Sequence, residues 1–114
     1  MSLSEGDVIT IDANAAIGHE QQGRRPALIV SVNALHSALG LAVVCAVTTH
    51  GARAERARND LELAIPAGLP VKGVILPHQV RTIDLKARNA TKQCTVPRVT
   101  LQATRARLKT LLGL

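Results

Sequence analysis

Residues 18–30 read GHEQQGRRPALIV, a polar stretch bounded by two glycines that runs directly into an apolar one. The apolar run that Pro26 opens predicts a buried β-strand over residues 27–32. The residues before it, 14–23, predict a loop. This stretch brings together an imidazole, a carboxylate and two guanidinium groups, which can move a proton and hold an anion. The stretch that starts the sheet is therefore also a candidate site.

Further strand patterns lie on both sides of this stretch. Residues 7–12 (DVITID) alternate in the manner of a half-buried strand. Residues 33–40 predict a connection with one helical turn around 34–38. Residues 41–47 form a third, apolar strand that ends at two threonines.

The second half of the chain predicts shorter elements. Residues 61–65 alternate again, and the PAGLP sequence at 66–70 predicts a turn. A strand over 73–76 is expected to stop at Pro77, and residues 79–85 predict a further strand.

Near the C-terminus the spacing of apolar residues changes from that of a strand to that of a helix. From Pro97 the leucines fall on one face of a helix of roughly four turns that ends at Gly113. Many short strands followed by one helix predict a mostly β fold, a small antiparallel barrel with a C-terminal helix.

The composition of the chain excludes one class of RNA-binding module and favours certain partners. With 114 residues the chain is expected to form a single domain, 1–114. It has no Phe, Tyr or Trp, which excludes RNA-binding modules that stack bases on aromatic side chains. The net charge of +6 favours nucleic acid, an anionic membrane or an acidic protein as partner, or serves solubility alone.

Other features of the chain argue against a metal site, a disulfide, a signal peptide and a membrane span. Cys45 and Cys94 lie in no metal or disulfide pattern, and Cys45 sits in an apolar run where it acts as a small hydrophobe. No signal peptide is visible, and the longest apolar stretch, about 39–47, is too short to cross a membrane. We therefore expect a cytoplasmic protein.

The first candidate site is the polar loop itself. Glu20 can serve as a general base, His19 as a base or an acid, and Arg25 as a clamp on a phosphate. The alternative is a solvated loop whose charges pair with one another.

A second candidate site follows the strand over 41–47. A hydroxyl of Thr48 or Thr49, next to His50, can donate to an anionic oxygen. The alternative is that both threonines only bond to the backbone and close the strand.

Two more candidates lie further along. His78 is a second acid–base group or a plain turn histidine, and Arg81 is a functional cation or the ion-pair partner of Asp84. Residues 52–60 form a basic loop that follows a phosphate backbone or is an ordinary solvated run. No metal-ligand spacing or glycine-rich nucleotide loop is present, so no metal and no cofactor are expected.

These motifs occur in the order typical of one protein family. The blocks are GDVI at 6–9, the loop at 18–26, Thr48 after Val47, GVI at 73–75 and QVRTIDLKAR at 79–88. They resemble the MazF/PemK-type toxins of bacterial toxin–antitoxin systems, most of all the PemK (Kid) and ChpB branch. The resemblance covers about residues 6–112.

The resemblance implies a fold and an activity. The fold is an SH3-like antiparallel barrel of the CcdB/PemK type with a C-terminal helix. The activity is metal-independent, sequence-selective cleavage of single-stranded RNA, which inhibits translation and growth. The implied partners are a second copy in a homodimer, with RNA at the dimer interface, and an acidic MazE/PemI-like antitoxin that occupies the same groove.

The resemblance also implies roles for individual residues. Arg25 and Thr48 stabilise the charge on the phosphorane, and Glu20 and His19 are the candidate bases. His78 stands where many relatives have an Asp, which has a catalytic role in the Kid branch, so His78 is a third candidate. Leu76 replaces the Arg of the Kid branch. We expect RNA contacts from Gln21, Arg24, Thr49, His50, Arg53, Arg56, Arg58, Gln79, Arg81 and Arg88.

Two other functions compete with RNA cleavage. A gyrase poison of the CcdB type shares the fold, but the chain ends LGL and lacks the Trp-Gly-Ile end that those proteins carry. A catalytically weakened module that only binds RNA or antitoxin is suggested by Leu76 and His78.

Overall fold

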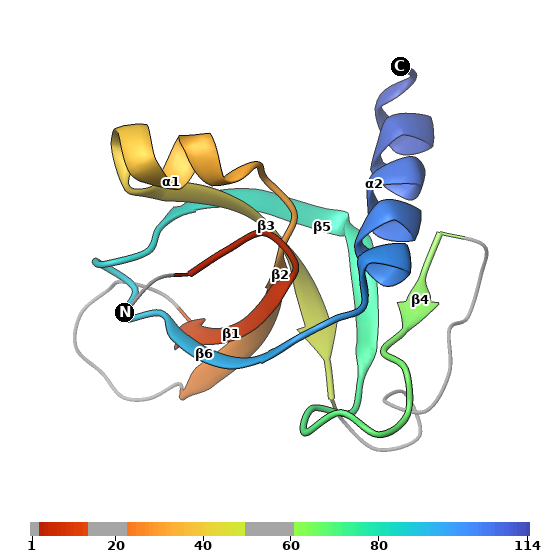
Figure 1. Ribbon diagram of the computed structural model, residues 1–114, viewed down its shortest axis with the longest axis horizontal. Coiled ribbons are helices and arrows are strands. Elements are labelled where there is room, and N and C mark those ends of the chain that lie inside the picture. Colours follow the sequence, from red (N-terminus) through yellow and green to blue (C-terminus); the bar gives the residue numbers. More distant parts are fainter. Residues whose placement is uncertain (1–2, 14–22, 50–60) are drawn as a thin grey trace.

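The computed structural model describes residues 3–13, 23–49 and 61–114, which form one antiparallel sheet and two helices (Figure 1). The sheet is curled into a half-barrel, and its six strands lie in the order β4-β5-β3-β2-β1-β6. The mostly β fold with a C-terminal helix is confirmed. The elements are β1 (Asp7–Asp12), β2 (Arg24–Ile29), α1 (Asn33–Leu39), β3 (Leu41–Thr48), β4 (Leu63–Ala64), β5 (Val74–Asp84), β6 (Thr91–Thr95) and α2 (Arg98–Leu112).

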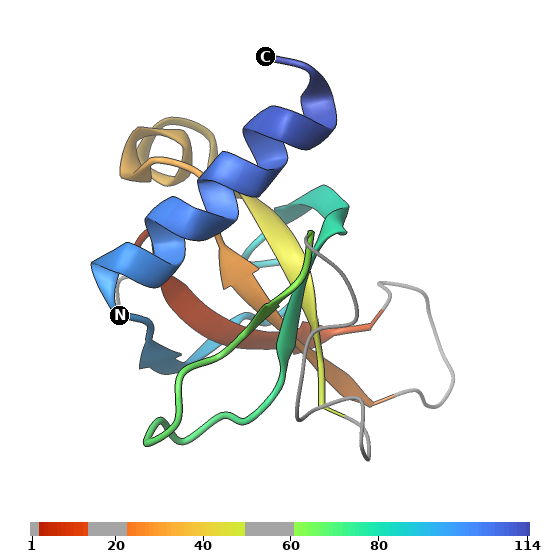
Figure 2. The same cartoon turned by 90° about the vertical axis from the view of Figure 1, so that its right-hand side faces the viewer.

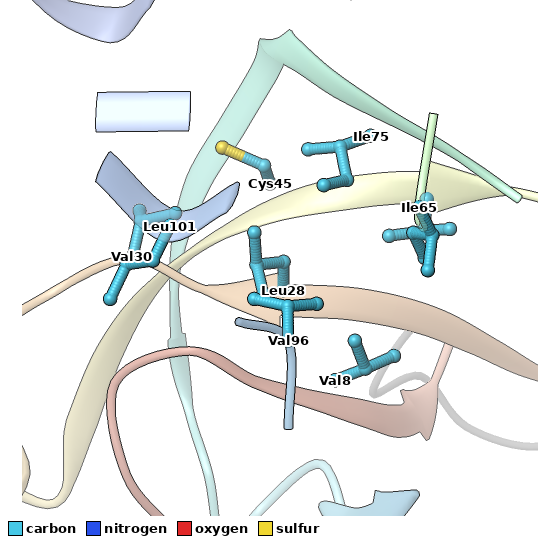
Figure 3. Close-up of a cluster of buried hydrophobic side chains, with 9 residues drawn as sticks. Val8, Leu28, Val30, Cys45, Ile65, Ile75, Val96 and Leu101 are labelled. Carbon is cyan, nitrogen blue, oxygen red and sulfur yellow. The ribbon is translucent and has the colours of Figure 1, made fainter. Parts of the chain in front are cut away.

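The sheet buries apolar side chains on both faces, because successive residues of a strand point to opposite sides. On one face the core is covered by α2, which lies across the strands in Figure 2 and contributes Leu101. Figure 3 shows this cluster, which includes Val8, Leu28, Cys45 and Ile75. The other face carries a second cluster, made of Ile9, Ile11, Ala27, Ile29, Ala42, Val44 and Ile83.

Strand β2 begins earlier than the sequence indicates. It starts at Arg24 and passes through Pro26, although we expected Pro26 to open the strand at residue 27. Pro26 is tolerated because it pairs only with Thr10 of β1, whereas pairing with β3 begins at Ala27. The segment 24–26 is therefore held by a neighbour on one side only.

The expected strand break at Pro77 is wrong. One strand, β5, runs from Val74 to Asp84 and turns a corner in Figure 1. Cys45 pairs with Val80 and Ala46 with Leu76, so residues 77–79 are extra on β5 and form a bulge. The ladder is already interrupted there, which is why a proline fits.

The remaining differences concern the ends of the sheet and the first helix. The strand expected over 61–65 shortens to the two residues of β4, and the turn at 34–38 is a full seven-residue helix, α1. The edge strand β6 was not predicted, because its residues are mostly polar and exposed. Neither described helix is long and apolar enough to cross a membrane.

Candidate functional site

A hollow of about 540 Å³ opens beside the second core cluster and brings several predicted site residues together. Its floor is apolar, with Ile11, Ala27, Val44, Ala46 and Val80 among the lining residues. Polar side chains surround this floor and come from β2, from β5 and from the end of β3. They are Arg24, Arg25, Thr48, Thr49, Gln79 and Arg81.

The strand register explains why Arg25 and Thr48 meet at this hollow. Ala27 of β2 is paired with Ala46 of β3. Continued by two residues along each strand, this register places Arg25 level with Thr48 on the same face, and both residues line the hollow. The two residues expected to stabilise the phosphorane are thus brought together from positions that are 23 apart in the sequence.

Of the two adjacent arginines, Arg25 is the one that lacks a partner among the described residues. Its side chain is exposed, and it makes no hydrogen bond or ion pair with any residue that the structure describes. Arg24, in contrast, donates to Asp12 Oδ1 at 2.8 Å and makes further bonds described below. Among the described residues, Arg25 therefore has no acceptor that competes with an anion.

The end of β3 is positioned by a close approach of Gly73, the residue before β5. A Cβ atom on Gly73 would lie 2.6 Å from the carbonyl oxygen of Thr48 and 2.8 Å from Cγ1 of Val47. Only a residue without a side chain fits there, because real Cβ contacts are not that short. Sequence reasoning placed Gly73 in a family block but missed this contact.

Two further arginines converge at the end of β1. Arg88 donates to the carbonyl oxygens of Asp12 and Ala13, at 3.2 and 2.9 Å, and Arg81 reaches the Ala13 oxygen at 3.5 Å. Partial burial, and then the charge of Arg88, lower the pKa of Arg81. Arg81 keeps its charge at neutral pH even so, because the ordinary pKa of a guanidinium group lies far above that pH. Arg81 thus remains a cation at the hollow, while Arg88 is engaged by the backbone.

His78 does not join this group of residues. It is exposed on the β5 bulge and is not among the described residues that line the hollow, whereas its neighbour Gln79 is. The other predicted site residues lie outside the described part of the chain. These are His19, Glu20, Gln21, His50, Arg53, Arg56 and Arg58.

Neither cysteine lines the hollow. Both cysteines are free, and burial raises the pKa of the Cys45 thiol to about 12, which keeps it protonated inside the core. Within residues 3–13, 23–49 and 61–114, no group of three or more His, Cys, Asp or Glu side chains is placed to hold a metal ion.

Comparison with known proteins assigns the chain to a family. Residues 4–112 match the model of the PemK-like, MazF-like toxin of type II toxin–antitoxin systems. The chain belongs to this family.

Relatives and solved structures agree with this assignment. The chain is 36% identical to the endoribonuclease PemK of Escherichia coli, over 96% of this chain and 82% of the relative. It is 42% identical to the endoribonuclease toxin ChpB of Escherichia coli K12, over 77% and 75%. A crystal structure of MazE-MazF from Deinococcus radiodurans superposes with a TM-score of 0.81 at 29% identity, covering 98% of this chain and 96% of that chain.

Proposed function

We propose that this chain is an endoribonuclease toxin that cleaves single-stranded RNA at the hollow between β2, β3 and β5. The family and the endoribonuclease relatives support this activity. The observation that carries it is that Arg25, which bonds to none of the described residues, lines the same hollow as Thr48, together with apolar side chains. A phosphate can be held by these two residues while a base or ribose covers the floor.

The chemistry follows from RNA itself and requires no metal. The ribose 2′-oxygen attacks the adjacent phosphorus, and the bond from phosphorus to the 5′-oxygen breaks. The 2′-OH gives its proton to a base, and an acid protonates the leaving 5′-oxygen. The products are a 2′,3′-cyclic phosphate and a 5′-OH end.

In this mechanism Arg25 and Thr48 donate to the phosphorane oxygens, where negative charge accumulates. Arg25 also supplies the proton to the leaving oxygen. The general base is one of Glu20, His19 and His78, of which His78 is the one in the described part of the chain and lies outside the lining of the hollow. Thr49, Gln79 and Arg81 contact the RNA on either side of the scissile phosphate.

The proposal also covers the domain, the oligomeric state, the location and the inhibitor of the enzyme. We propose that residues 1–114 act as one domain, as a homodimer, in the cytoplasm where mRNA is found. The proposed inhibitor is an acidic antitoxin of the MazE/PemI type, supported by the complexes that MazF relatives form with MazE. A chain of net charge +6 complements such a partner.

The test is RNA cleavage in EDTA, with the ends of the products mapped. Arg25→Ala is expected to lower kcat by about 100- to 1,000-fold, because it removes a donor that acts on the transition state. Arg98→Ala is the matched control, since Arg98 lies on α2 and does not line the hollow. The control is expected to keep wild-type activity.

Two results would overturn the proposal. The first is a wild-type protein that cleaves no RNA of mixed sequence; growth arrest through gyrase without cleavage would then favour the CcdB-like alternative. The second is an Arg25→Ala variant as active as the wild type. Unchanged far-ultraviolet circular dichroism would show that the variant is folded.

A further inference from the structure

The guanidinium group of Arg24 lies at the centre of a bonding network. Its Nη1 donates to Asp12 Oδ1 at 2.8 Å. Its Nη2 lies 2.8 Å from the carbonyl oxygen of Thr10 and 2.9 Å from Oγ1 of Thr91, and also contacts the carbonyl oxygen of Asn89. One side chain on β2 thus ties together β1, the turn after β5 and the first residue of β6.

A second layer of bonds holds the partners of Arg24. Asn89 Nδ2 donates to Asp12 Oδ2 at 2.7 Å, so both carboxylate oxygens of Asp12 are used. The bond from Asn89, and then the bond and charge of Arg24, lower the pKa of Asp12. Next to it, the N–H of Ala13 donates to the carbonyl oxygen of Gly23 at 3.3 Å and keeps the ends of β1 and β2 together.

The segment that carries Arg25 needs such support. From Arg24 to Pro26, β2 is paired with β1 alone, because its pairing with β3 starts at Ala27. Pro26 also lacks an N–H and contributes no donor to a ladder. Ladder bonds alone therefore leave the backbone of Arg25 free to shift relative to Thr48.

We propose that Arg24 is a positioning residue, which fixes the start of β2 so that Arg25 faces Thr48. The inference rests on the proposed function, since it assigns Arg24 to the same reaction. It replaces the sequence-based expectation that Arg24 contacts RNA. The donors of Arg24 are directed at acceptors of the protein, whereas those of Arg25 reach no acceptor in residues 3–13, 23–49 and 61–114.

Kinetics with two Arg24 variants separate positioning from phosphate binding. Arg24→Lys keeps the charge but loses the planar fork that reaches several acceptors at once. Both Arg24→Lys and Arg24→Gln are expected to lower kcat by about 10- to 100-fold, with little change in KM, because a small misplacement of a catalytic group is costly. Arg98→Gln is the charge-matched control and is expected to leave kcat unchanged.

Asp12→Asn removes a negative charge, whereas Arg24→Gln removes a positive one. Removing a negative charge strengthens RNA binding if Asp12 and Arg24 act only through their charges. Positioning instead predicts that Asp12→Asn lowers kcat, as the Arg24 variants do. The double variant Arg24→Gln/Asp12→Asn is expected to lose little more than either single one, because the two residues act as a unit.

Two measurements test the inference without RNA cleavage. Binding of a 2′-O-methyl RNA should show the same salt dependence for the wild type and Arg24→Gln, whereas a lost phosphate contact reduces the slope by about 0.7. Amide hydrogen exchange in the free protein should accelerate at residues 25, 27 and 28 in Arg24→Gln but not in Arg98→Gln. If the wild type cleaves no RNA, the proposed function fails, and the exchange experiment still tests the positioning.

Three results would overturn the inference. One is full kcat in Arg24→Lys, which would show that the charge alone is needed. Another is a salt slope reduced by about 0.7 in Arg24→Gln, which would make Arg24 a phosphate contact. The third is unchanged amide exchange at residues 25, 27 and 28 in that variant.

Discussion

Arg24 and Arg25 are adjacent and chemically identical, yet their guanidinium groups have different surroundings. Arg24 bonds to acceptors on β1, on β6 and on the turn after β5, and Arg25 bonds to none of the described residues. The difference arises from residues far along the chain, since Asn89 and Thr91 are 65 and 67 positions away from Arg24. At the scale of single residues, distant acceptors thus bind Arg24 and not Arg25 within the described part of the chain.

Gly73 permits a test of how closely the end of β3 must be placed. Gly73→Ala puts a Cβ within 2.6 Å of the Thr48 carbonyl oxygen, so the backbone must move. We expect a loss of stability of about 1–3 kcal/mol and a fall in kcat of about 10- to 100-fold as Thr48 shifts. Thermal unfolding and cleavage kinetics measure the two effects.

Gly68→Ala is the matched control for Gly73→Ala. A Cβ on Gly68 meets no atom within 4 Å, but the residue has φ +95°, so alanine there is strained. The control is expected to lose stability while kcat stays at the wild-type value. Wild-type kcat in Gly73→Ala would show that the close approach does not position Thr48.

At the scale of elements, α2 is held on the sheet by both packing and charge. Leu101 and Thr104 are buried, 2% and 0% exposed, against the face opposite the hollow. Arg105 donates from Nε to the Val30 carbonyl oxygen at 2.9 Å and from Nη2 to Glu5 Oε1 at 2.7 Å. The bond from Arg105 holds the pKa of Glu5 below the ordinary glutamate value of 4.5, against the opposing effect of burial.

This ion pair predicts a pH dependence of stability. The pKa of Glu5 is lower in the folded than in the unfolded protein, so its contribution is complete above the unfolded pKa and is lost as the pH falls through the folded pKa. The free energy of unfolding of Glu5→Gln should be lower than that of the wild type near about pH 7. The difference should shrink below about pH 4.5.

Urea unfolding of both proteins across this pH range checks the Glu5 prediction. Comparing the two proteins removes the effect of the other carboxylates, including Asp12, whose pKa is also lowered. A difference that stays constant down to about pH 3 would mean that the carboxylate of Glu5 does not titrate with folding.

At the scale of the whole molecule, local patterns predict elements better than their connections. The alternation of residues 7–12 and the leucine spacing of α2 were sufficient for β1 and α2. Pro77 misled the interpretation of β5, because whether a proline ends a strand or sits in a bulge depends on the pairing with β3. Strand β6 was missed because an exposed edge strand needs no apolar alternation.

The candidate site was predictable to a similar extent. The residue types and the family blocks pointed to Arg25, Thr48, Gln79 and Arg81, and the register gathers them at one hollow. The apolar floor was not predictable, because it requires knowing which face of each strand turns away from α2. The hydrogen bonds from Arg88 to the end of β1 were equally unpredictable, since their acceptors lie 76 and 75 residues away in the sequence.

The charge of the whole chain leads to a last prediction, about RNA affinity. A protein of net charge +6 that binds RNA through phosphates releases counterions, so the logarithm of the affinity falls linearly with the logarithm of the salt concentration. For about three phosphate contacts the slope on single-stranded RNA is about −2.1, or roughly a 20-fold loss between about 50 and 200 mM salt. Fluorescence anisotropy with a labelled 2′-O-methyl RNA measures this slope. Arg25→Ala should make it shallower by about 0.7, and Arg98→Ala should not change it. An affinity that does not respond to salt would mean that the hollow binds RNA through bases alone, and Arg25 would then have no phosphate to hold in the ground state.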